Sequence, residues 1–304
     1  MTASDKHWDA AQAARAEQDW QRILARHPEC QVATRLGTLA YREAAGAAED
    51  ADALVLLHGI GSGAASWAAQ FDALGARFRV LAWDAPGYGA STPPRQPSPQ
   101  AAEYVEALTA WLDALNLERV HLVGHSLGAL IAGAFARQHG ARLLSLQLLA
   151  PANGYGAASA ELREEKLASR LALLDAHGAQ GLAQRRSDNL TSVHASLEAR
   201  AWVRWNMARI VPDGYRQASH LLANGDLAGE LRRVRQAAPT LPLRVAVGSL
   251  DAVTPPRACA AVAEAAGVPL ETLGGLGHAC YVEDPSRLSD FISAFIEHHV
   301  KQKA

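Results

Sequence analysis

The sequence predicts an α/β fold in which a mostly parallel sheet is covered by helices on both faces. Two observations carry this prediction. Short runs that are almost wholly apolar recur at residues 54–57, 78–83, 120–123, 143–149, 243–247 and 270–273. A helical pattern follows most of these runs, and near-continuous apolarity is typical of parallel strands that are buried on both faces.

The N-terminal part of the chain stands outside this alternation. Residues 8–27 carry apolar side chains at helical spacing, and the pattern stops before Pro28, because a proline disfavours helix in the residue ahead of it. A short strand is expected at 38–41 and a turn at 44–52. We therefore predict a helical extension over residues 1–30.

A second departure falls between residues 153 and 238, where helical patterns such as 161–174 and 197–210 occur without a convincing strand. An all-helical stretch between two strands of one sheet must lie at an edge or an end of that sheet. We therefore expect a helical cap over 153–238. The α/β core would comprise residues 31–152 and 239–304.

Composition limits the partners of this 304-residue chain. Its formal net charge is −2 and its hydrophobic fraction is 49%, so it offers no electrostatic reason to bind nucleic acid or an anionic membrane. A small-molecule substrate is expected. Composition does not indicate an oligomeric state.

The cysteines and the absence of certain motifs limit cofactors and location. The three cysteines form no C-x-x-C pair, which argues against a disulfide framework and a thiolate zinc site. No ligand cluster or phosphate-binding loop is evident, so neither metal nor cofactor is expected. The first residues lack an apolar signal segment, and no apolar run approaches the roughly 20 residues that span a bilayer. These features predict a cytoplasmic protein.

The pentapeptide Gly124-His125-Ser126-Leu127-Gly128 lies between a predicted strand and a predicted helix. G-x-S-x-G in this context indicates a nucleophile elbow, in which the glycines allow the sharp turn that presents the serine hydroxyl. The same pentapeptide also occurs by chance in Gly/Ser turns, but the strand before it and the helix after it favour the elbow. Ser126 is therefore the predicted nucleophile.

Backbone N–H groups near this serine are expected to form an oxyanion hole. The N–H of Leu127 opens the helix that follows Ser126, where the helix dipole favours negative charge. The loop His58-Gly59-Ile60-Gly61 directly follows the strand at 54–57, and the N–H of Ile60 is its most plausible donor. His58 itself is interpreted as a packed loop histidine without a role in proton transfer.

A serine hydroxyl needs a general base, because it is a weak nucleophile while protonated. His278 is the preferred candidate, since it lies in a glycine-rich loop directly after the strand at 270–273. His125 is expected to point away. The orienting acid is predicted to be Asp251, which follows the strand at 243–247; Asp84 is its rival, but it lies in a Pro- and Gly-rich segment suited to a fixed turn. The chain order Ser, Asp, His is the order that this elbow implies.

Five motifs in order resemble the α/β-hydrolase superfamily over about residues 34–300. They are H-G-x-G at 58–61, D-x-P-G-x-G-x-S at 84–91, G-H-S-x-G at 124–128, G-x-x-D at 248–251 and G-H at 277–278. The resemblance implies an eight-stranded, mostly parallel sheet with a helical cap. It also implies that Ser126, Asp251 and His278 form the triad. The first 30 residues depart from the superfamily pattern.

The turn at 84–91 and the loop at 58–61 followed by Trp67 are similar to one branch of the superfamily. This branch contains small carboxylesterases, enol-lactonases, non-haem haloperoxidase-like enzymes and hydrolases of ring-cleavage diketones. Ser126 excludes the aspartate nucleophile of the dehalogenases and epoxide hydrolases in the superfamily.

Aromatic residues of the predicted cap are candidates for substrate binding. Trp202 and Trp205 are three residues apart and share a helical face, and Tyr215 follows them. The pair either forms the packing seam of the cap, which is the commoner arrangement, or lines an apolar pocket above Ser126. Arg185 and Arg186 could neutralise a substrate carboxylate, although adjacent arginines on a helix are usually solvated.

Three functions fit these observations. The favoured hypothesis is a serine hydrolase that cleaves a small carboxylic ester or lactone through an acyl-Ser126 intermediate. The alternative is a carbon–carbon bond hydrolase of ring-cleavage diketones that uses the same triad. A hypothesis of another class is a non-catalytic ligand receptor or interaction protein on the same scaffold, because fold does not fix function.

Overall fold

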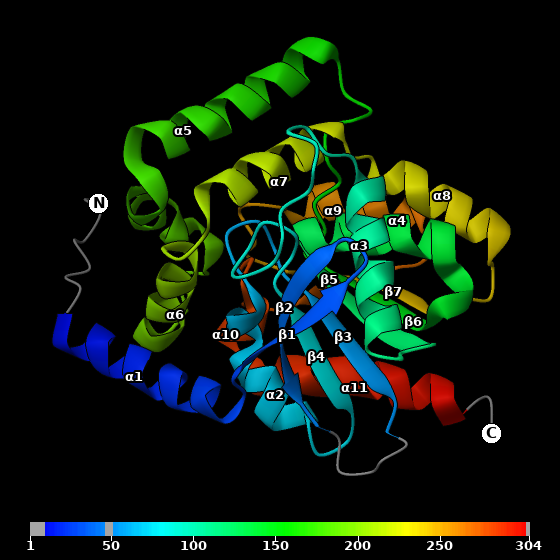
Figure 1. The fold of residues 1–304 in the computed structure, drawn as a ribbon, viewed down its shortest axis with the longest axis horizontal. Coiled ribbons are helices and arrows are strands. Elements are labelled where there is room, and N and C mark those ends of the chain that lie inside the picture. The colour runs from blue at the N-terminus through cyan, green and yellow to red at the C-terminus, as the bar shows by residue number, and fades with distance from the viewer. Residues whose placement is uncertain (1–9, 46–50, 302–304) are drawn as a thin grey trace.

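The computed structural model describes residues 10–45 and 51–301, and it confirms the predicted eight-stranded, mostly parallel sheet (Figure 1). The strand order is β1-β2-β4-β3-β5-β6-β7-β8. The first two strands pair antiparallel, as do β2 and β4, and all other neighbours are parallel. The strands are β1 (Glu29–Thr34), β2 (Gly37–Ala44), β3 (Ala53–Leu57), β4 (Arg79–Trp83), β5 (Val120–His125), β6 (Leu143–Leu149), β7 (Leu243–Gly248) and β8 (Leu270–Leu273).

Continuous apolarity identified the inner strands correctly. Every residue of β3 and β5 is buried, because helices cover both faces of the sheet. The neighbouring pair β1 and β2 is a hairpin at the edge, and β1 alternates exposed and half-buried residues. The sequence analysis predicted part of β2 and missed β1, whose polar alternating sequence carries no buried run.

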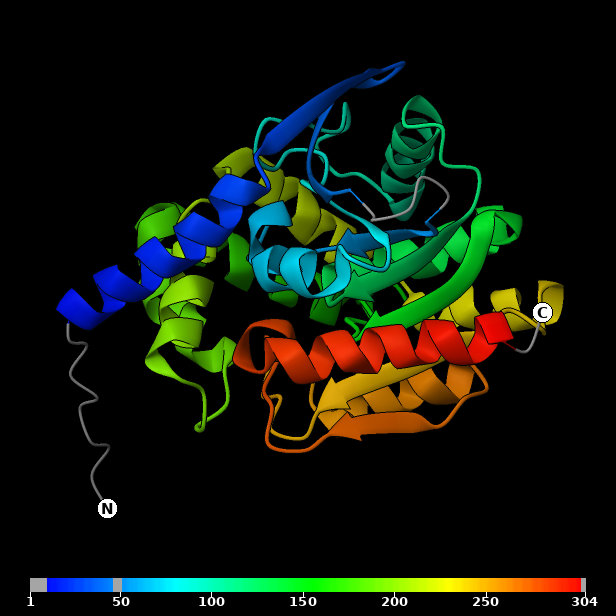
Figure 2. The ribbon, with the colours of Figure 1, turned by 90° about the horizontal axis from the view of Figure 1, so that it is seen from below.

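The helices that flank the sheet fall into two groups. On one face α3 (Ala101–Ala114), α4 (Leu127–His139), α8 (Leu227–Ala237) and α9 (Pro256–Ala265) pack in succession. On the other face α2 (Ala68–Leu74) packs on α11 (Pro285–Lys301), which runs along the sheet in Figure 2. Helix α10 (Cys280–Glu283) joins α11, and three short 3-10 helices are η1 (Ala64–Trp67), η2 (Gly140–Arg142) and η3 (Ser187–Leu190).

The segment expected to form a cap contains α5 (Ala160–Arg186), α6 (Leu197–Met207) and α7 (Pro212–Asn224), which lie together beyond one end of the sheet (Figure 1). Helix α5 bends at Gly178, whose φ of 61° breaks the helical path. Helix α8, which falls within the same predicted segment, instead packs on α4 of the core.

The N-terminal helix α1 (Ala10–Arg26) packs against α6 and α2 (Figure 1). Its Trp20 stacks on Trp202 with ring centroids 5.2 Å apart, and Trp202 in turn stacks on Trp205 at 4.5 Å. The predicted helix at residues 8–27 thus corresponds to α1, with residues 8 and 9 outside the described part of the chain. Within the ranges 10–45 and 51–301, no helix is both long and apolar enough to cross a membrane.

Candidate active site

Ser126 occupies the junction between β5 and α4, where the backbone is strained. Its φ of 54° and ψ of −111° lie in a region that non-glycine residues rarely adopt. The N–H of Ser126 donates to the Leu149 carbonyl oxygen at 3.0 Å, which ties the turn to β6. Both motif glycines are needed sterically, because a Cβ at Gly124 would meet the Gly128 carbonyl oxygen at 2.4 Å and one at Gly128 would meet the Leu57 carbonyl oxygen at 2.4 Å.

His278 and Asp251 form a buried hydrogen-bonded pair. The Nδ1–H of His278 donates to Asp251 Oδ2 over 2.8 Å, which leaves Nε2 as the proton acceptor. The N–H groups of Val253 and Thr254 donate to Asp251 Oδ1 at 2.7 and 2.8 Å. Burial alone raises the pKa of Asp251, but the His278 imidazole and the Thr254 donors outweigh burial and hold the pKa below its ordinary value. Asp251 is therefore poised as a carboxylate.

Thr254 is a residue of this pair that the sequence analysis missed. Its hydroxyl oxygen lies 2.9 Å from Asp251 Oδ2, 3.0 Å from the Ala150 carbonyl oxygen and 3.2 Å from His278 Nδ1. The hydroxyl carries one proton, so it donates to one of the two oxygens while a lone pair faces the Nδ1–H. Thr254 thus fixes the imidazole and its carboxylate relative to the end of β6. The only sequence signal was its position three residues after Asp251.

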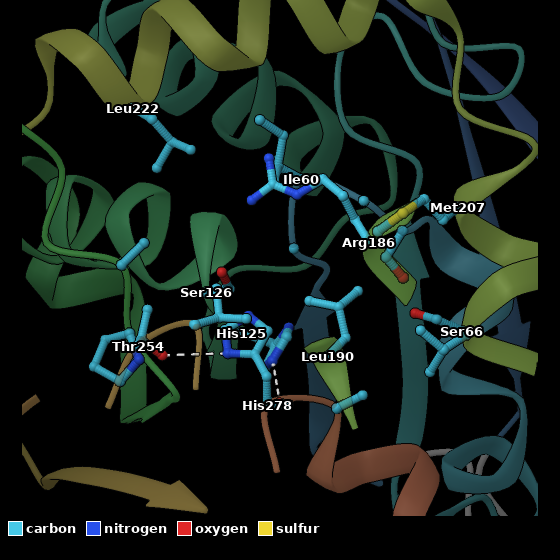
Figure 3. Close-up of a pocket in the computed structure, with 18 of the residues that line it drawn as sticks. Ile60, Ser66, His125, Ser126, Arg186, Leu190, Met207, Leu222, Thr254 and His278 are labelled. Carbon is cyan, nitrogen blue, oxygen red and sulfur yellow. Dashed lines mark hydrogen bonds between the residues drawn. The ribbon is translucent and has the colours of Figure 1, made fainter. Parts of the chain in front are cut away.

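Ser126 and His278 line the same cavity, which has a volume of about 330 Å³ (Figure 3). The structure contains no direct hydrogen bond between the serine hydroxyl and the imidazole in its described part. Catalytic hydrogen bonds of this kind often tighten only when substrate is bound. Both side chains are almost wholly buried, with exposed fractions of 6% and 4%.

The other two histidines near the site are neutral, and His125 lines the cavity next to His278, so the expectation that it points away is wrong. His58 Nδ1–H donates to the Gly59 carbonyl oxygen at 2.8 Å, and its Nε2 accepts from the Ala85 N–H at 3.0 Å. Burial lowers the pKa of His58 to about 4. His125 Nε2–H donates to the His278 carbonyl oxygen at 2.9 Å, and burial lowers the pKa of His125 to about 3. His125 therefore supports the backbone of His278.

Asp84, the rival acid, supports a loop. Its Oδ1 accepts from the Ala64 N–H at 2.8 Å, and its carbonyl oxygen accepts from the Ser91 hydroxyl at 2.6 Å. The same Ser91 hydroxyl accepts from the Ala40 N–H of β2 at 2.9 Å. Burial raises the pKa of Asp84 to about 6. The D-x-P-G-x-G-x-S turn is thus fastened to β2 and η1, and its carboxylate has no contact with His278.

Of the two residues predicted to stabilise an oxyanion, one lines the cavity and the other, Leu127, does not. Ile60 lines the cavity, and the hydroxyl of Tyr88 donates to its carbonyl oxygen at 2.9 Å. Leu127 is the first residue of α4, so its N–H has no acceptor within the helix. Neither N–H makes a hydrogen bond with the described residues.

Of the cap residues predicted to bind substrate, one lines the cavity and two do not. Tyr215 of α7 lines the cavity. Trp202 and Trp205 do not, because they point from α6 toward Trp20 of α1; α6 instead gives Val203, Asn206 and Met207 to the cavity. The prediction that Trp202 and Trp205 line the pocket is therefore wrong. The alternative prediction, that the pair packs inside the cap, agrees with the stack.

Arginines of α5 also differ in position. Arg186 lines the cavity, whereas its neighbour Arg185 is exposed and does not. Arg170, which the sequence analysis did not single out, lines the cavity as well. Among the residues that the structure describes, no group of three or more His, Cys, Asp or Glu side chains is arranged to hold a metal ion.

Comparison with known proteins identifies the family. A family model described as alpha/beta hydrolase fold matches residues 52–285. The chain belongs to this family. Among curated relatives, an uncharacterized protein of Mycobacterium tuberculosis is 31% identical over 277 residues, which cover 84% of this chain and 79% of that protein.

Two further matches show how far the similarity extends. A Rattus norvegicus protein named as a 1-acylglycerol-3-phosphate O-acyltransferase is 38% identical over 101 residues, which cover 32% of this chain and 29% of that protein. The crystal structure of the enol-lactonase from Burkholderia xenovorans has a TM-score of 0.77 and 22% identity, and the match covers 88% of this chain and 100% of that chain. At this identity the structural likeness establishes the fold alone.

Proposed function

We propose that this α/β-hydrolase is a serine hydrolase that cleaves a small carboxylic ester or lactone through an acyl-Ser126 intermediate. The observation that carries the proposal is the His278–Asp251 hydrogen bond of 2.8 Å beside a strained serine on one cavity. A buried carboxylate fixes the tautomer that leaves Nε2 free to take a proton. The enol-lactonase with the same fold is consistent with this substrate class.

In the proposed acylation, His278 Nε2 takes the Ser126 proton as Oγ attacks the ester carbonyl carbon. The N–H groups of Ile60 and Leu127 donate to the resulting oxyanion, and the helix dipole of α4 adds to this stabilisation. When the tetrahedral intermediate collapses, the bond to the leaving oxygen breaks and that oxygen takes the proton from the imidazolium. The acyl group then remains bonded to Ser126 Oγ.

Deacylation repeats the same proton transfers with water. His278 Nε2 takes a proton from water as the water oxygen attacks the acyl carbonyl carbon. The second tetrahedral intermediate then expels Ser126 Oγ. The imidazolium returns the proton to the serine. Asp251 stabilises the imidazolium in both halves, and Thr254 holds the pair in place.

Turnover of defined substrates tests the proposal. We expect p-nitrophenyl esters graded by acyl length to be cleaved to the free acid, and a dienone diketone to be cleaved far more slowly. Ser126→Ala should lower ester turnover by roughly 10³-fold or more, because a triad member acts as part of a unit. A variant that keeps a tenth of wild-type turnover, or faster cleavage of the diketone, would contradict the proposal.

A further inference from the structure

The charged side chains that line the cavity are of one sign. Arg170 and Arg186 both line it, and neither Asp nor Glu does. Both arginines are half-buried. Their charge therefore faces a space that is otherwise lined mainly by apolar groups, where an anion would interact with it more strongly than in water.

The two arginines also lack partners that neighbouring arginines of the cap possess. Arg204 of α6 pairs with Asp188 at 3.5 Å, and Arg216 of α7 pairs with Asp175. Within the described part of the chain, Arg170 and Arg186 form no ion pair and no hydrogen bond. Partly burying a guanidinium without an acceptor is unfavourable, so an acceptor in the cavity would compensate for that cost.

The bend of α5 explains how both side chains reach one cavity. Residues 170 and 186 are 16 positions apart, which corresponds to about 24 Å along a straight helix. The non-helical backbone at Gly178 breaks that line between them. Figure 3 shows the Arg186 side chain pointing into the cavity from the side opposite His278.

We propose that the cavity binds an ester or lactone whose acyl part carries a carboxylate, with Arg186 as the main specificity-determining residue and Arg170 as its second cation. This inference rests on the proposed hydrolase function. A guanidinium matches a carboxylate with two parallel hydrogen bonds, which would fix the far end of the acyl chain while its carbonyl lies at Ser126. The cavity volume of about 330 Å³ suits a substrate of this small size.

A matched pair of substrates tests the carboxylate. The p-nitrophenyl monoester of glutaric acid is anionic, and the 5-methylhexanoyl ester is its neutral isostere. We expect wild-type kcat/KM to be at least about 10-fold higher for the anionic ester, since charge-assisted hydrogen bonds in such a cavity are strong. Arg186→Gln should bring the ratio of kcat/KM for the two esters near one, since only the anion uses this charge. Arg185→Gln is the matched control, because this exposed neighbour does not line the cavity, and it should keep the wild-type ratio.

Additional measurements distinguish loss of the anion site from loss of the hydrolase function and from misfolding. Arg186→Lys keeps the charge and should retain part of the preference, and circular dichroism should match wild type for all variants. Binding of monomethyl glutarate, measured by calorimetry on Ser126→Ala with and without Arg186→Gln, does not depend on turnover. Arg186-dependent binding without ester turnover in wild type would support the anion site and refute the hydrolase. Cleavage of both esters with no preference, or with a preference that survives Arg186→Gln, would refute the anion site alone.

Discussion

Two buried aspartates at the same edge of the sheet have opposite electrostatic surroundings. Asp251 accepts from an imidazole and two backbone N–H groups. Burial raises the pKa of Asp251, but His278 and Thr254 outweigh burial and lower it. Asp84 accepts from the Ala64 N–H, and burial raises its pKa to about 6. Burial and position after a strand are therefore shared by both residues, whereas the contact with His278 belongs to Asp251 alone.

This difference predicts which carboxylate the reaction needs. Asp251→Asn should lower kcat/KM for a neutral ester by about 10³- to 10⁴-fold, because the amide favours the wrong imidazole tautomer and does not stabilise imidazolium. Asp84→Asn should lower it by less than about 10-fold, since the amide oxygen can still accept from the Ala64 N–H. Steady-state kinetics on the two folded variants tests this prediction. A larger loss of kcat/KM in Asp84→Asn than in Asp251→Asn would show that Asp251 is not the triad acid.

The raised pKa of Asp84 predicts a pH-dependent stability difference. Its folded-state pKa of about 6 exceeds the ordinary 3.8, so the folded protein binds the extra proton and loses stability as pH rises between these values. Asp84→Asn removes this loss. The free energy of unfolding of the variant, relative to that of wild type, should therefore increase by about 2–3 kcal/mol between pH 4 and pH 7. Urea unfolding at both pH values measures it. Buried His58 and His125 change stability with pH in the opposite direction, but they are present in both proteins, so their contributions cancel in the comparison. Free energies of unfolding that differ by the same amount at both pH values would contradict the prediction.

At the scale of elements, the N-terminal helix α1 packs against α6 of the predicted cap. Trp20 of α1 stacks on Trp202 of α6, and the other side of α6 supplies Val203, Asn206 and Met207 to the cavity. The helix outside the family pattern is thus connected through one aromatic stack to the wall of the site.

Removing that stack should loosen the cap. Trp20 is half-buried, so Trp20→Ala should lower the free energy of unfolding by about 1–2 kcal/mol, which is less than for a fully buried aromatic residue. Arg22→Ala on the same helix breaks only an exposed ion pair with Asp19 and should change stability by less than about 0.5 kcal/mol. Denaturant unfolding of the two variants tests this. An equal effect of both substitutions would show that the stack does not brace α6.

Elements were predictable where their physical signal is local. The inner strands are apolar throughout because both of their faces are covered, and this pattern is visible in the sequence. Edge strand β1 is missed because its faces are exposed or half-buried. The spacing of Trp202 and Trp205 correctly places them on one helical face, but only the position of α1 determines what that face contacts.

The site shows the same division. Ser126, Asp251 and His278 follow predicted strands and lie in recognisable motifs, so they could be predicted as a triad from the sequence. Thr254 and Arg170 have no such motif. The role of Thr254 depends on distances to β6 and His278, and the position of Arg170 depends on the bend at Gly178. Such contacts are made by the tertiary structure and have no sequence pattern of their own.

At the scale of the molecule, the parallel sheet assembles the site. Neighbouring strands β5, β6, β7 and β8 point the same way, so the loops after them meet at one edge. Ser126 follows β5, Asp251 follows β7 and His278 follows β8, and the cap closes over this edge with Tyr215 and the two α5 arginines. The core thus carries Ser126, Asp251 and His278, and helices α5 and α7 add side chains to the walls of the cavity.

Covalent labelling by a fluorophosphonate probe, mapped by peptide mass spectrometry, tests the central claim that Ser126 is an activated nucleophile. The account predicts one adduct on the peptide that contains Ser126, formed fast in wild type, abolished in Ser126→Ala and slowed at least 100-fold in His278→Ala, since the base activates the hydroxyl. Arg185→Gln should label like wild type. An adduct on another residue, or labelling of Ser126 at the same rate without His278, would contradict the account.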